Sequence, residues 1–366
     1  MHDAGAVLGL PELVDPPAGA LRVPPNLAKV ILRFSASLQA PDADAALSLH
    51  ASDGTDVALA LGDAVACAGT CYAALPAGTL EPTSLYVVEI GADVLHFEGG
   101  KPVPAGQIGS FTTADAPDAY APLIGDLAMT MVEGCVQAQF VTDEPAWAQV
   151  IITAGDQVAS LDLGAMGTKF DLTTHLPDLP TDVDARAVAR ATDRAGNSAD
   201  SAAVALHLPP RTPRLVITEV LGNPAGSEYT QEFVEVKNLE AEPVSLAGFS
   251  IADKTGSDAL PDLEVPAGGF ALLVAAAFVL DDGKDPVPRD GTVIVPVSGR
   301  IGADGLSNSG EPVQLVSNGV VVSQYGGWVD VSASAWNGMS VHRVSVDACD
   351  QPSAWTSTPE MPTPGW

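Results

Sequence analysis

Three short segments near the C-terminus constrain the fold more than any other feature of the chain. They cover residues 215–224, 231–238 and 244–251, and they alternate apolar with polar residues, broken by Asn-Pro and Gly turns. Successive side chains of a strand point to opposite faces, so this alternation predicts strands with one buried face. Several such strands separated by turns predict an antiparallel β-sandwich.

The same pattern recurs along all 366 residues, a length that suits two or three domains. Pro-rich joints at 114–122 and 208–213 divide the chain into segments 1–115, 119–209 and 212–366. Short strands are predicted in the first two at 29–34, 46–50, 57–61, 71–75, 85–91, 109–113, 135–141, 148–153, 169–173 and 184–190. We therefore expect an all-β protein of three tandem Ig-like β-sandwich domains joined by short Pro-rich linkers.

The strong negative charge of the chain argues against partners that are themselves anionic. Lys and Arg number 16 against 46 Asp and Glu, which gives a net charge of −30. This charge repels nucleic-acid phosphates and anionic lipids, so we expect no nucleic-acid partner. The longest apolar stretch, 269–280, is shorter than the roughly 18 residues that a membrane-spanning helix needs. It predicts a buried strand, and we expect no transmembrane segment in this chain.

The four cysteines suggest an oxidising compartment. Cys67 and Cys71 flank Ala-Gly-Thr, and a bridge between them would add about 2 kcal/mol on the loop-entropy model. Two reduced thiols on a loop remain the alternative. Cys135 and Cys349 lie in different predicted domains, where a bond would join the two domains. Structural zinc is disfavoured, because it usually needs two closely spaced Cys pairs and the chain has one.

The segment 212–366 resembles the lamin-tail domain, an Ig-like fold that is mostly a non-catalytic module. The resemblance rests on seven pieces in order, among them Ile-Thr-Glu-Val (217–220), Glu-Phe-Val-Glu (232–235), Leu-Ala-Gly-Phe-Ser-Ile-Ala-Asp (246–253), Gly-Leu-Ser-Asn-Ser-Gly-Glu (305–311) and Trp-Asn-Gly-Met-Ser-Val-His-Arg (336–343). One departure is His342, where the family commonly has an acidic residue before the arginine. The resemblance implies a structural role for Glu219, Glu232 and Glu235, such as pairing with Arg343.

The other two segments resemble modules of secreted bacterial proteins. Segment 1–115 is similar to bacterial Ig-like domains of the surface-layer type, through its Val-Pro-Pro-Asn entry (23–26), Leu-Glu-Pro-Thr-Ser-Leu-Tyr-Val-Val (80–88) and Ser-Phe-Thr-Thr (110–113). Segment 119–209 is similar to fibronectin-III and related Ig-like modules, through Thr-Asp-Glu-Pro-Ala (142–146) and Ala-Thr-Asp-Arg-Ala-Gly-Asn (191–197). In the last stretch, Asp193 and Asn197 suit a turn because their side chains can bond nearby amides.

A search for catalytic motifs predicts no enzyme. None of the six histidines belongs to a His-Glu-x-x-His pair, as a zinc hydrolase would need. Ser340 and His342 would share a strand face, but no strained Gly-x-Ser-x-Gly turn presents the serine. Glu232 and Glu235 are three residues apart in a strand, so they should point to opposite faces and cannot form an acid–base pair.

Calcium is the ligand that the acidic loops suggest best. Asp281, Asp282 and Asp285 offer closely spaced oxygens, as do the shorter groups Asp42–Asp44 and Asp53–Asp56, but none follows the EF-hand order. We predict that calcium, if any metal, binds at residues 281–285 and expect no other cofactor. Trp328, Trp336, Trp355 and Trp366 are predicted to pack in the fold, with a glycan-binding surface as the alternative.

These observations predict a non-catalytic secreted or cell-surface protein for adhesion, display or spacing at the bacterial envelope, through protein or glycan partners. The alternative is an accessory or binding portion of an extracellular hydrolase system. The first residues, 1–5, carry neither a basic start nor a signal-peptide core. Because the rest of the chain has extracellular character, we expect a signal peptide or lipid anchor upstream of this sequence.

Overall fold

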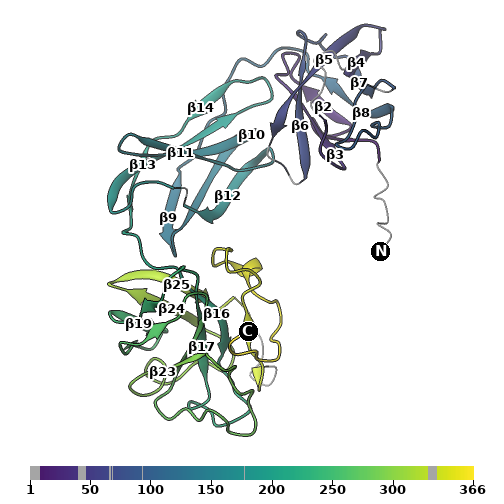
Figure 1. Cartoon of the computed structure of the whole chain (residues 1–366). Helices are drawn as coiled ribbons and strands as arrows, with labels where there is room; N and C mark the ends of the chain where they lie inside the picture. The colour runs from purple at the N-terminus through teal and green to yellow at the C-terminus, as the bar shows by residue number, and fades with distance from the viewer. Residues whose placement is uncertain are drawn as a thin grey trace. The chain divides into compact units, whose positions relative to one another are not determined.

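The computed structural model describes residues 9–39, 47–65, 67, 69–92, 94–176, 178–328 and 336–366, and the statements below refer to these. The chain is all-β, with one short 3-10 helix, η1, at Pro352–Ala354 (Figure 1). Its residues group into two compact units. Unit 1 comprises Met1–Ala128, Ala138–Asp171 and Arg186–Leu206, and unit 2 comprises Met129–Gln137, Leu172–Ala185 and His207–Trp366.

The first sheet has eight strands in the order β1-β3-β6-β5-β4-β7-β8-β2. They are β1 (Glu12–Asp15), β2 (Ala20–Val23), β3 (Val30–Phe34), β4 (Leu47–Ala51), β5 (Asp56–Val65), β6 (Thr70–Pro76), β7 (Leu85–Ile90) and β8 (Gly106–Thr113). Every strand places at least one buried side chain in a single core, from Leu13 on β1 to Phe111 on β8. The sheet therefore curls around its own apolar face, and the predicted alternation is what supplies that face.

The second sheet is built around one long strand. Its members are β9 (Ala128–Val132), β10 (Cys135–Ala154), β11 (Gln157–Asp162), β12 (Gly167–His175), β13 (Val183–Thr192), β14 (Ser198–Asp200) and β15 (Val204–Leu208). β10 pairs with β9, β11, β12 and β13. From the sequence we expected two strands, 135–141 and 148–153, with a break between them. That expectation was wrong: Pro145 lies before the ladders with β11 (149–154) and β13 (147–153), so its missing N–H interrupts neither.

The remaining sheets lie between residues 215 and 342. The strands are β16 (Leu215–Leu221), β17 (Phe233–Asn238), β18 (Val244–Ser245), β19 (Phe249–Ala252), β20 (Ser257–Ala259), β21 (Glu264–Val265), β22 (Phe270–Val274), β23 (Val293–Pro296), β24 (Pro312–Ser317), β25 (Val320–Gly326) and β26 (Val341–His342). A five-stranded sheet has the order β23-β22-β17-β16-β26, and a four-stranded sheet the order β20-β19-β24-β25. A small ribbon pairs β18 with β21.

One core holds these two main sheets together. Ile217 and Val234 of the first sheet and Ile251 and Leu315 of the second are fully buried members of it. Trp336, the largest fully buried side chain, belongs to the same core. The apolar stretch predicted as a buried strand is β22, whose last four residues are inaccessible to solvent. The segment therefore forms a β-sandwich, as the alternating pattern predicted.

Candidate functional site

Ser340, His342 and Glu219 form the arrangement that most resembles catalytic machinery. The Ser340 hydroxyl donates to Glu219 Oε1 over 2.6 Å and lies 2.9 Å from His342 Nε2. However, Ser340 is fully buried and Glu219 is 1% exposed. A nucleophile must reach a substrate atom. The Ser340 hydroxyl instead donates its hydrogen bond to the buried carboxyl of Glu219. The arrangement ties β26 to β16, where Glu219 and His342 are register partners.

Two buried glutamates also hold the C-terminal segment. Glu219 accepts a hydrogen bond from the Thr363 N–H at 3.1 Å, and Glu235 accepts one from the Gly365 N–H. The two glutamates face each other across β16 and β17. Burial raises the pKa of Glu219 to about 7, against the lowering effect of the Ser340 hydrogen bond. Burial also raises the pKa of Glu235.

Glu232 is a third carboxyl of this kind, with no exposed surface. Its Oε2 accepts a hydrogen bond from the Leu306 N–H at 2.9 Å, and burial raises its pKa to about 7. Gly305, with φ +87, passes so close that a Cβ there would lie 2.8 Å from Glu232 Oε2. The expectation that these glutamates have a structural role agrees with this geometry, but the partner we named, Arg343, was wrong.

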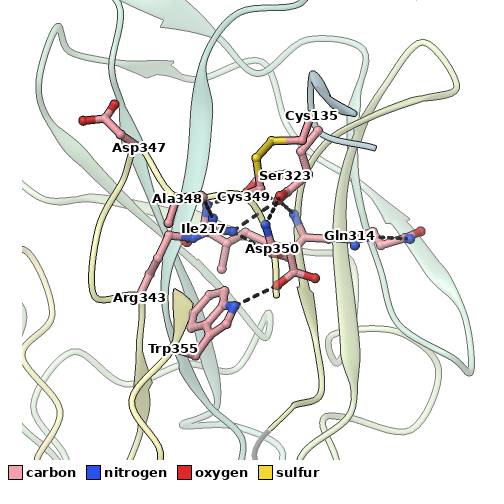
Figure 2. Close-up of polar contacts among 12 residues, drawn as sticks. Cys135, Ile217, Gln314, Ser323, Arg343, Asp347, Ala348, Cys349, Asp350 and Trp355 are labelled. Carbon is pink, nitrogen blue, oxygen red and sulfur yellow. Dashed lines mark hydrogen bonds and ion pairs between the residues drawn. A yellow bond between two sulfur atoms is a disulfide. The ribbon is translucent and has the colours of Figure 1, made fainter. Parts of the chain in front are cut away.

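Arg343 instead lies in a polar cluster with Glu133, and Figure 2 shows Arg343 beside Ile217 and Ala348, two other members of this cluster. Its guanidinium is 3.2 Å from Glu133 Oε1, and both side chains are almost completely buried. Its other N–H groups donate to the carbonyl oxygens of Ile217, Ala348 and Gln324 at 2.7 to 2.8 Å. Burial raises the pKa of Glu133, and the positive charge of Arg343 opposes that effect.

The remaining groups of Glu133 are also satisfied. Its Oε2 accepts a hydrogen bond from the Asp350 N–H at 3.0 Å, and its Oε1 accepts from the Ser323 hydroxyl and the Gln324 N–H. The Asp350 carboxylate accepts from the indole N–H of Trp355 at 2.7 Å, the contact drawn in Figure 2. Through the hydrogen bond from the Asp350 N–H, this cluster connects the segment around residue 350 to the turn at Glu133. Sequence reasoning missed it, because Glu133 lies between 190 and 217 residues from the groups that it binds.

Both cysteine pairs considered from the sequence are disulfides. Cys67 pairs with Cys71, and Cys135 pairs with Cys349. Although Cys135 and Cys349 were assigned to different domains, both belong to unit 2. His175 lies against the second disulfide, with Nδ1 3.4 Å from Cys135 Sγ. A cavity of about 520 Å³ opens beside His175, Glu133 and Arg343, with Leu179, Pro213 and Val322 among its apolar lining residues.

The predicted calcium residues accept hydrogen bonds from backbone N–H groups, some in their own loop and some at Ala225 and Gly226. Asp282 Oδ1 accepts from the N–H groups of Lys284 and Asp285, both at 2.9 Å. Asp285 accepts from the N–H groups of Ala225 and Gly226, both at 2.8 Å. Asp281 accepts from the Gly283 N–H at 3.0 Å. Calcium binding at this loop stays a prediction, and the structure shows in addition that the three carboxylates order the loop.

Of the other acidic groups, Asp53 accepts a hydrogen bond from the Thr55 N–H at 2.9 Å, and Asp42 and Asp44 lie outside the described residues. The structure brings together a set that sequence reasoning missed. Asp118, Glu144 and Asp193 in unit 1 each offer a carboxylate oxygen, and these oxygens lie within 4.8 Å of one another. Burial raises the pKa of Glu144, and the nearby acidic residues add to this effect.

Asp193 is the buried member of that set, with 1% of its surface exposed. Its two oxygens accept hydrogen bonds from the backbone and side-chain N–H groups of Asn197, both at 2.9 Å. This is the turn chemistry that the sequence of residues 191–197 predicts. The residues that surround it come from distant parts of the chain, so no local spacing signals the group.

Unit 1 also has a cavity of about 610 Å³, with Lys29, Trp147 and Met166 among its lining residues. Lys29 Nζ lies 3.9 Å from the centroid of the Trp147 ring, and burial lowers the pKa of this lysine. At the cavity edge, Arg194 forms an ion pair with the buried Asp15 over 2.6 Å. The cavity is therefore lined by the Trp147 ring and by two cationic side chains that already have partners: Lys29 contacts Trp147, and Arg194 pairs with Asp15.

The four tryptophans of the C-terminal segment divide into two pairs. Trp336 and Trp355 are buried, as packing predicts. Trp328 and Trp366 are 45% and 71% exposed. Arg289 Cζ lies 4.4 Å from the centroid of the Trp366 ring, and the Trp328 indole N–H donates to Asp350 over 3.1 Å.

Comparisons with known proteins show likenesses of structure only. No family model matches the chain, and no curated protein matches it. Among solved structures, the N-terminal part of the bacterial S-layer protein SbsC has a TM-score of 0.27 and 12% identity, covering 54% of this chain. This chain spans only 44% of that structure.

Two further solved structures have similar scores. Chicken CNTN1 domains FN1–FN3 have a TM-score of 0.25 and 10% identity, covering 86% of this chain and 94% of that one. A DUF4876 family protein from Bacteroides thetaiotaomicron has a TM-score of 0.27 and 10% identity, covering 60% and 92%. Likenesses this distant carry nothing about function. Within the described residues, no helix has the length and apolarity that a membrane crossing requires.

Proposed function

We propose that this chain is a non-catalytic, multidomain β-protein of the bacterial cell surface or its surroundings. Its role would be adhesion, display or spacing. The observation that carries the proposal is the state of Ser340: the hydroxyl with catalytic-type neighbours is fully buried and bonded to Glu219. Ser340, Glu219 and Glu235 bond to one another's strands and to the C-terminal segment. Such contacts are expected of residues with a structural role.

The two disulfides support an extracellular location. Disulfides persist in oxidising compartments and are rare in the cytosol. A net charge of −30 supports solubility in such a setting and argues against a nucleic-acid partner. As a finer assignment, we propose that segment 212–366 is a lamin-tail-like domain, on the ordered sequence pieces described above and on the Ig-like β-sandwich that they form.

The test is surface proteolysis of intact source cells, followed by detection with an antibody against segment 212–366. A surface protein loses its signal when protease is added to intact cells, while a cytosolic marker does not. If the protein is protected until the cells are lysed, the proposal is wrong. In parallel, the purified protein should show no turnover of ester, phosphodiester or glycoside substrates above that of a Ser340→Ala variant.

A second candidate, an accessory or glycan-binding portion of an extracellular hydrolase system, is favoured by the exposed indole of Trp328. Glycan-binding modules often use exposed aromatic rings of this kind. The discriminating variant is Trp328→Ala, because Trp336 is a core residue whose loss would disturb folding. Binding on a glycan array that disappears in Trp328→Ala supports this candidate, and a catalytic domain encoded in the same gene would support it further.

A further inference from the structure

His175 lies with one ring nitrogen against the Cys135–Cys349 disulfide, in a cluster that the proposed surface role does not use. The Sγ atoms of both cysteines and a ring nitrogen of His175 lie within 4.8 Å of one another. The distance from His175 Nδ1 to Cys135 Sγ is 3.4 Å. Two sulfurs and one imidazole nitrogen are a donor set typical of soft or borderline metal ions, and unlike the oxygen set that calcium requires.

The contact of the second ring nitrogen, Nε2, shows which nitrogen of His175 carries the hydrogen. His175 Nε2 lies 2.7 Å from the carbonyl oxygen of Asp347. A carbonyl oxygen only accepts hydrogen bonds, so Nε2 carries the hydrogen. The neutral ring then has its lone pair on Nδ1, the nitrogen that faces the sulfur atoms. Histidines that ligate metals characteristically donate their other N–H to such a carbonyl.

The distances suit a tetrahedral ion once the sulfurs are free. With Zn–S and Zn–N bonds of about 2.3 and 2.0 Å, tetrahedral geometry places S and N about 3.5 Å apart and the two sulfurs about 3.8 Å apart. The sulfur–nitrogen separation is already close to this value. Cys349 Sγ, which lies within 4.8 Å of the other two donor atoms, must move away from Cys135 Sγ, and breaking their bond allows this.

We propose that the reduced form of this protein binds one zinc ion through Cys135, Cys349 and His175. A thiol reductant supplies two electrons and two protons, which convert the disulfide into two thiols while the reductant becomes a disulfide. Zinc then displaces two protons, so that two thiolates and neutral His175 coordinate the ion. The fourth position is taken by water, since His175 is exposed and lines the cavity of about 520 Å³.

The consequence is that one set of residues provides two alternative cross-links. Cys135 begins β10, His175 ends β12, and Cys349 lies in the segment held by Glu133. In an oxidising compartment the disulfide joins Cys135 to Cys349. Under reducing conditions the metal ion holds the same two residues, together with His175, in one place.

Cobalt titration of the reduced protein tests the proposal. The protein carries Cys67→Ser and Cys71→Ser, so that Cys135 and Cys349 provide the only thiols. Under anaerobic reducing conditions, Co²⁺ should produce sulfur-to-cobalt charge-transfer and tetrahedral d–d absorption at one ion per chain. Addition of one equivalent of Zn²⁺ should abolish both. The oxidised protein should show neither band.

His175→Ala in the same background should weaken binding at least about 10-fold, since even outer-shell changes cost that much at metal sites. His207→Ala, which removes another exposed histidine of unit 2, should leave binding unchanged. Zinc should also raise the Tm of the reduced protein and not that of the oxidised one, which shows whether folding and binding are coupled. Absence of the charge-transfer band, or equal affinity in the His175→Ala variant, overturns the proposal.

Discussion

Replacing Glu219 with Gln should flatten the pH dependence of stability. Burial raises the pKa of this carboxyl to about 7 from 4.5, so the folded state holds its proton more tightly than the unfolded state does. The protonated carboxyl therefore stabilises the fold fully below pH 4.5, and this contribution is lost as pH rises through 7. At 1.36 kcal/mol per pH unit, the difference 7 − 4.5 amounts to about 3 kcal/mol.

Gln is a suitable probe because it retains most contacts and removes the titration. Its amide oxygen can replace Oε1, which accepts from the Ser340 hydroxyl and the Thr363 N–H. Urea unfolding at pH 5 and pH 8 gives the loss of unfolding free energy for each protein. We expect Glu219→Gln to lose about 2.5 kcal/mol less than the wild type between these pH values, since the window begins above the unfolded pKa.

One control variant and the behaviour of two other titrating groups separate the effect of Glu219 from other effects. Glu232, whose pKa burial also raises to about 7, titrates in both proteins and cancels in the comparison. Burial lowers the pKa of His342, so this group works in the opposite direction: its contribution is lost as pH falls through its folded pKa. Glu264→Gln on the exposed position of β21 should keep the wild-type pH dependence. An equal loss in Glu219→Gln and wild type would refute the argument.

Three further predictions concern the contacts of unit 2, each measured by urea unfolding. Arg343→Ala should cost about 3–5 kcal/mol, because it leaves a buried carboxylate and three carbonyl groups without their partner. Combined Cys135→Ser and Cys349→Ser should cost roughly 5 kcal/mol on the loop-entropy model, since the bond spans 214 residues, and a cost near zero would contradict that model. In EDTA, Asp285→Ala should cost about 3 kcal/mol, because two charge-assisted hydrogen bonds are lost, and Asp281→Ala, with one bond, clearly less. Equal costs for the two aspartate variants would show that the loop is not held in this way.

The sequence predicted the strands well where alternation was regular. The segments expected at 29–34, 71–75 and 109–113 correspond to β3, β6 and β8. It missed β1 and β2, which are four residues long and lie beside prolines, because such short strands leave too little periodicity. Pairing with β3 and β8, rather than local pattern, makes them strands.

The burial of three carboxyl groups and the identity of their partners were not predicted from the sequence. Glu219, Glu232 and Glu235 have the spacing of ordinary strand residues, yet each is at most 2% exposed. Their partners are backbone N–H groups of Thr363, Leu306 and Gly365, and no local pattern encodes which distant N–H will face a carboxylate.

The cysteine–histidine cluster shows the same limit. Cys spacing alone disfavoured zinc, because only Cys67 and Cys71 lie close together in the chain. The three donors Cys135, His175 and Cys349 meet only after β10 and β12 have paired and the chain beyond β26 has packed against the turn at Glu133. A donor set of this kind depends on tertiary structure and has no signature in residue spacing.

The Cys135–Cys349 bond also changes how the chain would respond to tension. A pull applied between a point before Cys135 and a point after Cys349 passes through the sulfur bridge and bypasses everything between them. Because the two cysteines are separated by 214 positions in the sequence, roughly 700 Å of extended polypeptide would stay locked until that bridge is reduced. In the oxidised protein the chain between the two cysteines would bear no load, and it would extend only after a reductant had opened the bridge with no zinc ion present to hold Cys135 and Cys349.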